Sequence, residues 1–148
     1  DFDQMSLIDK DGLLIETLNQ IKIKSPERIT DENILFLSQS LLNVLLTTNN
    51  LIKRQEYAHA YQSLSNVQKY LLWLIRIVTN QTNHWESPTK SLETDIDKDW
   101  YSKFRLTTSD LDKENLNIAF QNSLNLSKKL FDELDIATDL KLLLNRIG

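Results

Sequence analysis

An arginine and a histidine stand close together in the sequence, at positions 54 and 59, near the expected start of a helix. A guanidinium stabilises negative charge on a phosphate and an imidazole exchanges protons, so Arg54 and His59 form a candidate pair for cleaving an RNA phosphodiester. Such a spacing also arises easily by chance. The competing interpretation is a surface arginine beside a histidine at a helix start.

A second group of candidates consists of aromatic residues that can line a pocket for an organic ligand. Tyr and Trp suit this role because they combine an apolar body with a polar tip. The candidates for pocket walls are Tyr57, Tyr61, Trp85 and Tyr101, and the candidate polar contact is Glu86. The alternative is that the aromatic side chains pack in a core or an interface and that the glutamate is solvated.

Several kinds of chemistry find no support in the sequence. The histidines at 59 and 84 stand far apart and neither lies in a metal-binding motif, so we expect no metal site. The only internal glycine is Gly12, which excludes a glycine-rich phosphate loop. The chain has no cysteine, and its formal charge of -4 does not favour a nucleic-acid partner.

The N-terminus and the longest apolar run indicate where the protein works. The run at 70–78 is far shorter than the ~20 residues that span a bilayer and contains Arg76, so no membrane partner is expected. The first residues are acidic and lack the apolar region of a signal peptide. We therefore predict a cytoplasmic protein.

The elements that position these residues are predicted to be helices. Only two glycines and two prolines interrupt the chain, which favours an all-α fold: an up-and-down bundle of about four to six helices. The central helix is expected at 56–78, because its apolar positions cover well over 100° of its surface. A short extended segment is expected near the N-terminus, at 5–8, with a short helix at 13–21.

Capping residues predict where the other helices begin. Thr30 opens a helix at 31–51, whose apolar face we expect Leu35 and Leu46 to broaden. Ser87 and Pro88 predict a short helix at 88–95. The remaining helices are expected at 98–105 after Asp97, at 113–134 after Asp112, and at 138–146.

Four stretches of the chain carry a family resemblance. They are ERITDENILFL at 27–37, LIKRQEYAHAYQSLSNVQK at 51–69, NHWESPTKSLETDI at 83–96 and YSKFRLTTSDLDKENLNIAFQNSLNL at 101–126. In this order they resemble the C-terminal half of lincosamide nucleotidyltransferases and, more distantly, aminoglycoside adenylyltransferases. The resemblance implies a helical domain that follows a small α/β nucleotidyltransferase domain, helps to bind the antibiotic substrate and forms a homodimer.

The resemblance also implies a division of labour between domains. In the family, the nucleoside triphosphate, Mg²⁺ and the catalytic carboxylates belong to the preceding domain, which is marked by a Gly-Ser pair that this sequence lacks. Residues 1–24 are then expected to be a linker leaving that domain, and residues 25–148 to be the helical substrate-binding domain. By itself this chain is expected to bind no cofactor and to transfer no nucleotide.

Two other interpretations remain open. The spacing of Arg54 and His59 is similar to the Rx4-6H motif of HEPN-type ribonucleases, helical proteins in which this pair acts on RNA in a dimer cleft. The other interpretation is a purely structural dimerisation module.

Overall fold

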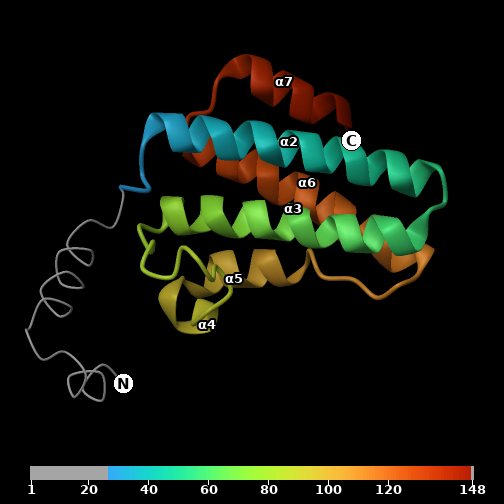
Figure 1. The fold of residues 1–148 in the computed structure, drawn as a ribbon, viewed down its shortest axis with the longest axis horizontal. Helices are drawn as coiled ribbons and strands as arrows, with labels where there is room; N and C mark the ends of the chain where they lie inside the picture. Colours follow the sequence, from blue (N-terminus) through green and yellow to red (C-terminus); the bar gives the residue numbers. More distant parts are fainter. Residues whose placement is uncertain (1–26, 148) are drawn as a thin grey trace, which may run out of the picture.

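The computed structural model describes residues 27–147, and within this range every regular element is a helix (Figure 1). The predictions for residues 1–24, including the extended segment and the short helix at 13–21, lie outside the described residues. The helices are α2 (Asp31–Lys53), α3 (Tyr57–Val78), α4 (Leu92–Asp95), α5 (Lys98–Arg105), α6 (Lys113–Glu133) and α7 (Thr138–Ile147). The predicted all-α fold is confirmed.

Helices α2 and α3 form an antiparallel hairpin that is joined by only three residues. Thr30 caps α2 as predicted, because its hydroxyl accepts a hydrogen bond from the Asn33 amide at 3.2 Å. The hairpin turns at Gln55, whose φ of 62° lies in the left-handed region. On the facing sides of the two helices, the hydroxyls of Thr48 and Ser63 lie 2.8 Å apart.

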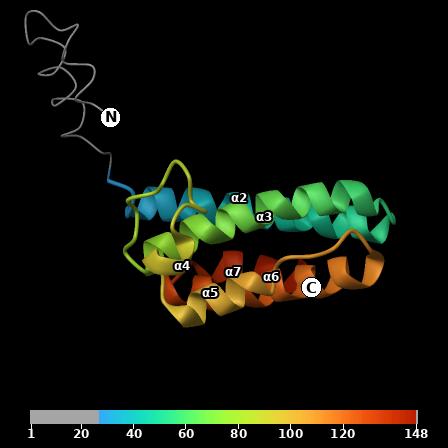
Figure 2. The ribbon, with the colours of Figure 1, turned by 90° about the horizontal axis from the view of Figure 1, so that it is seen from below.

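Helix α3 is the centre of the bundle, as its wide apolar surface predicted. It contacts α2 on one side and α6 and α5 on the other, and its central Leu71 is fully buried. The α2–α3 hairpin forms one layer, and α5, α6 and α7 form a second layer against it (Figure 2). Taken in chain order, α2, α3, α5, α6 and α7 alternate in direction, so the bundle is up-and-down (Figure 1). No helix within 27–147 has both the length and the apolar character of a membrane span.

The predicted helix at 88–95 is wrong in its first half. Residues 79–91 form turns, and α4 begins only at Leu92, after Ser91 with a φ of 53°. The carbonyls of Pro88 and Lys90, which a helix would use for its own ladder, instead accept hydrogen bonds from Arg76. The side chain of a different helix therefore determines the path of this segment.

Candidate functional site

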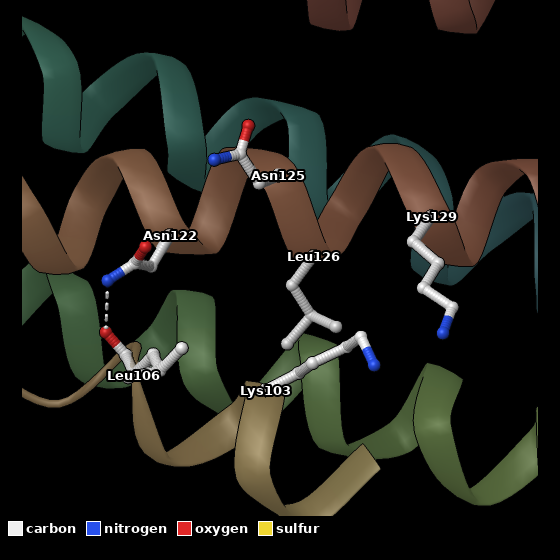
Figure 3. A pocket seen from close by; sticks show the side chains of 6 residues that line it. All are labelled: Lys103, Leu106, Asn122, Asn125, Leu126 and Lys129. Atoms are coloured by element: carbon white, nitrogen blue, oxygen red, sulfur yellow. Dashed lines mark hydrogen bonds between the residues drawn. The ribbon is translucent and has the colours of Figure 1, made fainter. Parts of the chain in front are cut away.

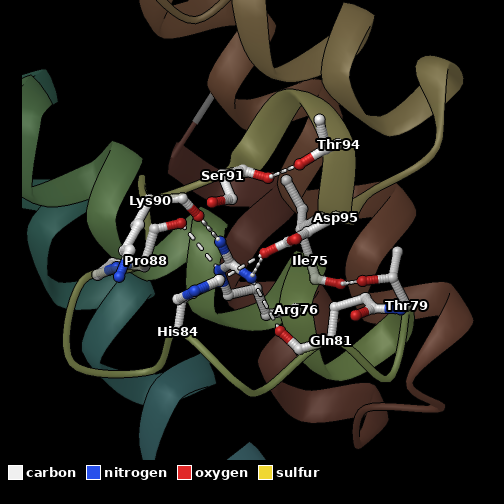
Figure 4. Close-up of polar contacts among 10 residues, drawn as sticks. All are labelled: Ile75, Arg76, Thr79, Gln81, His84, Pro88, Lys90, Ser91, Thr94 and Asp95. Carbon is white, nitrogen blue, oxygen red and sulfur yellow. Dashed lines mark hydrogen bonds and ion pairs between the residues drawn. The ribbon is translucent and has the colours of Figure 1, made fainter. Parts of the chain in front are cut away.

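The segment between α3 and α5, residues 79–97, is held by an arginine in the last turn of α3. Arg76 lies in that turn between Ile75 and Ile77, and its side chain is 0% exposed because the segment covers it (Figure 4). Its hydrogen bonds run from Nε to the Pro88 carbonyl (2.9 Å), from Nη1 to the Gln81 carbonyl (2.9 Å) and Asp95 Oδ2 (3.0 Å), and from Nη2 to the Lys90 carbonyl (2.7 Å). Four N–H groups of one guanidinium thus hold the 79–97 segment and the Asp95 carboxylate in place.

A carboxylate and an imidazole meet beside this arginine. Asp95 Oδ2 lies 2.8 Å from His84 Nδ1 and also accepts the hydrogen bond from Arg76 (Figure 4). The hydrogen bond with His84, and next the one from Arg76, hold the pKa of Asp95 below its usual value of 3.8. The side chain of His84 is 27% exposed, whereas that of Arg76 is fully buried. The histidine therefore connects a buried ionic contact with the surface.

Next to His84, two tryptophans stack between two cations. The rings of Trp73 and Trp85 lie 5.9 Å apart with an interplanar angle of 25°, and Trp73 Nε1 donates to the Trp85 carbonyl at 3.0 Å. Lys69 Nζ lies 4.8 Å from the centre of the Trp73 ring, and Arg28 Cζ lies 5.3 Å from that of Trp85. We call Lys69, Trp73, Trp85 and Arg28 the tryptophan stack.

The outer end of the tryptophan stack is exposed and polar. Arg28 Nη2 lies 2.9 Å from Glu86 Oε1, and the Glu86 side chain is 87% exposed. This ion pair joins the segment that precedes α2 to the 79–97 segment. Exposed ion pairs contribute little stability, so breaking this one costs little free energy.

The structure brings together only some of the residues predicted to bind a substrate. Trp85 and Glu86 lie side by side in the tryptophan stack region, and Tyr101 lies in α5 with its hydroxyl 3.4 Å from Glu93 Oε1. Tyr57 and Tyr61 begin α3, whereas Trp85 follows its C-terminal end. The Trp85 ring stacks on Trp73, and ~18 Å of helix separates Tyr61 from Trp73, so the structure does not bring the tyrosines and Trp85 together.

Of the candidate ribonuclease pair, Arg54 lies on the connection between α2 and α3, and His59 lies in the first turn of α3. Their side chains are 70% and 64% exposed. Glu56 stands between them, with its carboxylate oxygens 3.9 Å from Arg54 Nη1 and 3.6 Å from His59 Nδ1. This carboxylate would repel a phosphodiester at the position where the pair would hold it.

A groove of about 260 Å³ lies between α5 and α6 (Figure 3). Asp99 pairs with both Lys103 and Lys129, and these contacts lower the pKa of Asp99 and raise that of Lys129. Lys129 Nζ also lies 4.5 Å from the centre of the Trp100 ring. The residues that line the groove are Lys103, Leu106, Asn122, Asn125, Leu126 and Lys129. The lysines are thus already engaged within the protein.

Sequence reasoning missed the contacts of Arg76 and Asp95 and considered His84 only as a metal ligand. One signal was available: an arginine inside the apolar run of a buried helix needs hydrogen-bond partners, and the following segment is rich in polar groups. The sequence gives no means of choosing Asp95 over Glu86 or Glu93. In the part of the chain that the structure describes, no three potential metal-ligating side chains come together.

The acid sensitivity of the fold should depend on Asp95. Its pKa is lower in the folded chain than in the unfolded chain, so its contribution to stability is present above the usual pKa of 3.8 and is lost as the pH falls through the folded value. We expect Asp95→Asn to lower the melting temperature at about pH 7 and the difference from wild type to shrink towards about pH 2. Thermal melts across this range test it, and a constant difference would contradict it.

Comparison with known proteins gives one match that covers most of the chain. A search of curated proteins finds no match to this sequence. The model of the family described as "Lincosamide nucleotidyltransferase-like, C-terminal domain" matches residues 30–147, from the N-cap of α2 to the end of α7. This range contains the whole helical bundle, including the 79–97 segment and the tryptophan stack apart from Arg28. The chain therefore belongs to the lincosamide nucleotidyltransferase-like C-terminal domain family.

Proposed function

We propose that this chain is the substrate-binding domain of an antibiotic nucleotidyltransferase and that it binds a lincosamide at the tryptophan stack. The observation that carries the proposal is the pair of stacked indole rings between two cations, held at one end of the bundle by Arg76. The description of the family supports a lincosamide as the ligand. Aminoglycosides, which the sequence resemblance also allowed, have no comparable support from the family match.

The tryptophan stack suits a ligand that has both an apolar face and polar groups. Lincosamides combine a sugar with an apolar amide-linked ring, and sugar faces pack well against indole rings. Arg28 covers one face of Trp85 and is held there by an exposed ion pair with Glu86. A ligand can displace Arg28, stack on Trp85 and use the released Glu86 carboxylate as a polar partner.

The position of the tryptophan stack fits a partner domain on the N-terminal side. Residues 27–30 reach the bundle at the same end as the 79–97 segment (Figure 1). Arg28 contacts both Trp85 and Glu86. A preceding nucleotidyltransferase domain would therefore lie next to this ligand site. In our proposal that domain supplies the nucleoside triphosphate, Mg²⁺ and the catalytic carboxylates, and the whole protein works in the cytoplasm.

A homodimer is the second part of the proposal. Large apolar side chains remain exposed on the outer helices, among them Leu142 (55%) and Leu143 (47%) on α7 and Leu46 (49%) on α2. Exposed apolar groups of this kind are typical of surfaces that pack against another chain. Light scattering on the purified chain tests this part, and a monomer at all concentrations would contradict it.

Replacing Trp85 should weaken lincosamide binding. We expect Trp85→Ala to raise the dissociation constant for lincomycin by at least ~10-fold, because one face of the tryptophan stack is lost. Glu86→Gln should have a smaller effect, since Glu86 is exposed. Isothermal titration calorimetry measures both, after circular dichroism has shown that the variants fold.

The matched control is Leu111→Ala, which removes an exposed apolar side chain in the turn before α6, outside the tryptophan stack. Its affinity for lincomycin should equal that of wild type. Equal affinities for Trp85→Ala and wild type would rule out the tryptophan stack as the ligand site. Binding of an aminoglycoside in place of lincomycin would mean that the substrate class is wrong.

A further inference from the structure

The imidazole of His84 has one nitrogen committed to the protein and one directed elsewhere. Nδ1 lies 2.8 Å from Asp95 Oδ2, and no other residue within 27–147 forms a hydrogen bond with the ring. A carboxylate accepts hydrogen bonds and cannot donate one when ionised, so it places the proton of neutral His84 on Nδ1. Nε2 of the neutral ring is then a hydrogen-bond acceptor on a side chain that is 27% exposed.

The orientation of the His84 imidazole is fixed by Asp95 and by the residues that hold Asp95. Asp95 cannot rotate freely, because the same oxygen also binds Arg76 Nη1 at 3.0 Å. Arg76 is in turn held by three backbone carbonyls and is fully buried (Figure 4). Such an arrangement holds the acceptor in place before a ligand arrives, which reduces the entropy lost on binding.

The charges around His84 determine what kind of group Nε2 can bind. The positive charge of Arg76 and the negative charge of Asp95 offset each other, and the nearby carboxylate of Glu86 is paired with Arg28. A ligand carboxylate or phosphate offers no proton to an acceptor nitrogen. A hydroxyl group does, and the neighbouring Trp85 provides an indole ring on which a sugar can stack.

We propose that His84 Nε2 accepts a hydrogen bond from a sugar hydroxyl of the ligand, with Asp95 and Arg76 as its positioning residues. This inference rests on the proposed function, because it assigns a contact to the ligand that stacks on Trp85. It adds the group of the ligand that is recognised, a sugar hydroxyl, and the residue that accepts its hydrogen bond.

The first test is the position of the proton on His84. The chain has two histidines, so His59→Phe leaves His84 as the single imidazole in a ¹⁵N long-range correlation spectrum. At about pH 8 we expect the proton on Nδ1 of His84 in wild type. In Asp95→Ala, Nδ1 loses the acceptor that holds its proton, so the preference for the proton on Nδ1 should be lost. Asp95→Asn, whose amide oxygen can take the place of Oδ2 between Arg76 and His84, should keep the proton on Nδ1.

The second test is binding of lincomycin. Adding it should shift the His84 Nε2 resonance and leave His59 unchanged. His84→Phe, which keeps a ring and removes the acceptor, should weaken binding about three- to tenfold, and Asp95→Ala should weaken it similarly. His59→Phe is the matched control and should bind like wild type.

The outcomes separate the inference from the proposed function. Wild-type affinity in His84→Phe, or a proton on Nε2 in wild type, overturns the inference while the lincosamide site at Trp85 stands. No binding of lincomycin to wild type overturns both. A loss of the Nδ1 preference in Asp95→Ala that is accompanied by weaker binding supports the assigned roles of His84 and Asp95.

Discussion

Replacing Arg76 with methionine is expected to lower the free energy of unfolding by about 3–5 kcal/mol, the cost of removing one partner from a buried ionic contact. The substitution leaves the Asp95 carboxylate without its guanidinium and leaves the carbonyls of Gln81, Pro88 and Lys90 without donors. Urea unfolding followed by circular dichroism measures the loss. Because the 79–97 segment depends on these bonds, lincomycin binding should be lost as well.

Two further variants make this result specific. Arg76→Lys retains the charge, but a single ammonium cannot reach four acceptors in the directions that the planar guanidinium serves, so most of the loss should remain. Arg105→Met removes an exposed arginine from α5 and should change stability by no more than about 0.5 kcal/mol. A loss below about 1 kcal/mol in Arg76→Met would contradict the role that we assign to this side chain.

Truncating Leu71 to alanine is expected to cost about 2.7–5 kcal/mol, since it leaves a cavity where α3 meets its neighbours. Leu71 is 0% exposed and lies midway along α3, which packs against both α2 and α6. The same change at Leu46, which is 49% exposed on α2, is the matched control and should cost less than about 1 kcal/mol. Equal losses at the two positions in urea unfolding would mean that α3 is not the centre of the core.

Much of the fold follows from local signals in the sequence. The N-caps Thr30, Asp97 and Asp112 each accept a backbone hydrogen bond at the helix start where they were predicted to. Capping is a local interaction within a few residues, so the sequence contains all of it. The width of the apolar surface likewise identified α3 as the central helix.

Features that depend on distant residues were not predictable in the same way. Leu35 and Leu46 were expected to broaden the buried face of α2, but they are 47% and 49% exposed, because periodicity does not reveal which flank a neighbour leaves open. The segment at 88–91 was expected to be helical because Ser87 and Pro88 form a sound local start signal. In the folded chain, the carbonyls of Pro88 and Lys90 accept hydrogen bonds from Arg76, and the helix does not begin there.

In the candidate site, too, some features were predictable from the sequence and others were not. Trp85 and Glu86 were chosen for their residue types beside a loop, and the structure places them with Arg28 and Trp73. Tyr57 and Tyr61 were chosen by the same criterion but lie at the other end of α3. Residue type selects candidates, whereas only the path of the chain determines which of them meet.

The most direct test of the account is a map of backbone and indole N–H chemical-shift changes as lincomycin is added to the ¹⁵N-labelled chain. The chain has three tryptophans, and Trp100 is an internal reference, because it packs under Lys129 beside the α5–α6 groove. We expect the largest changes at Arg28, at residues 84–86 and at the indoles of Trp73 and Trp85, with Trp100 unchanged. Changes confined to Tyr57 and Tyr61, changes confined to the α5–α6 groove, or no changes at all would contradict a lincosamide site at the tryptophan stack.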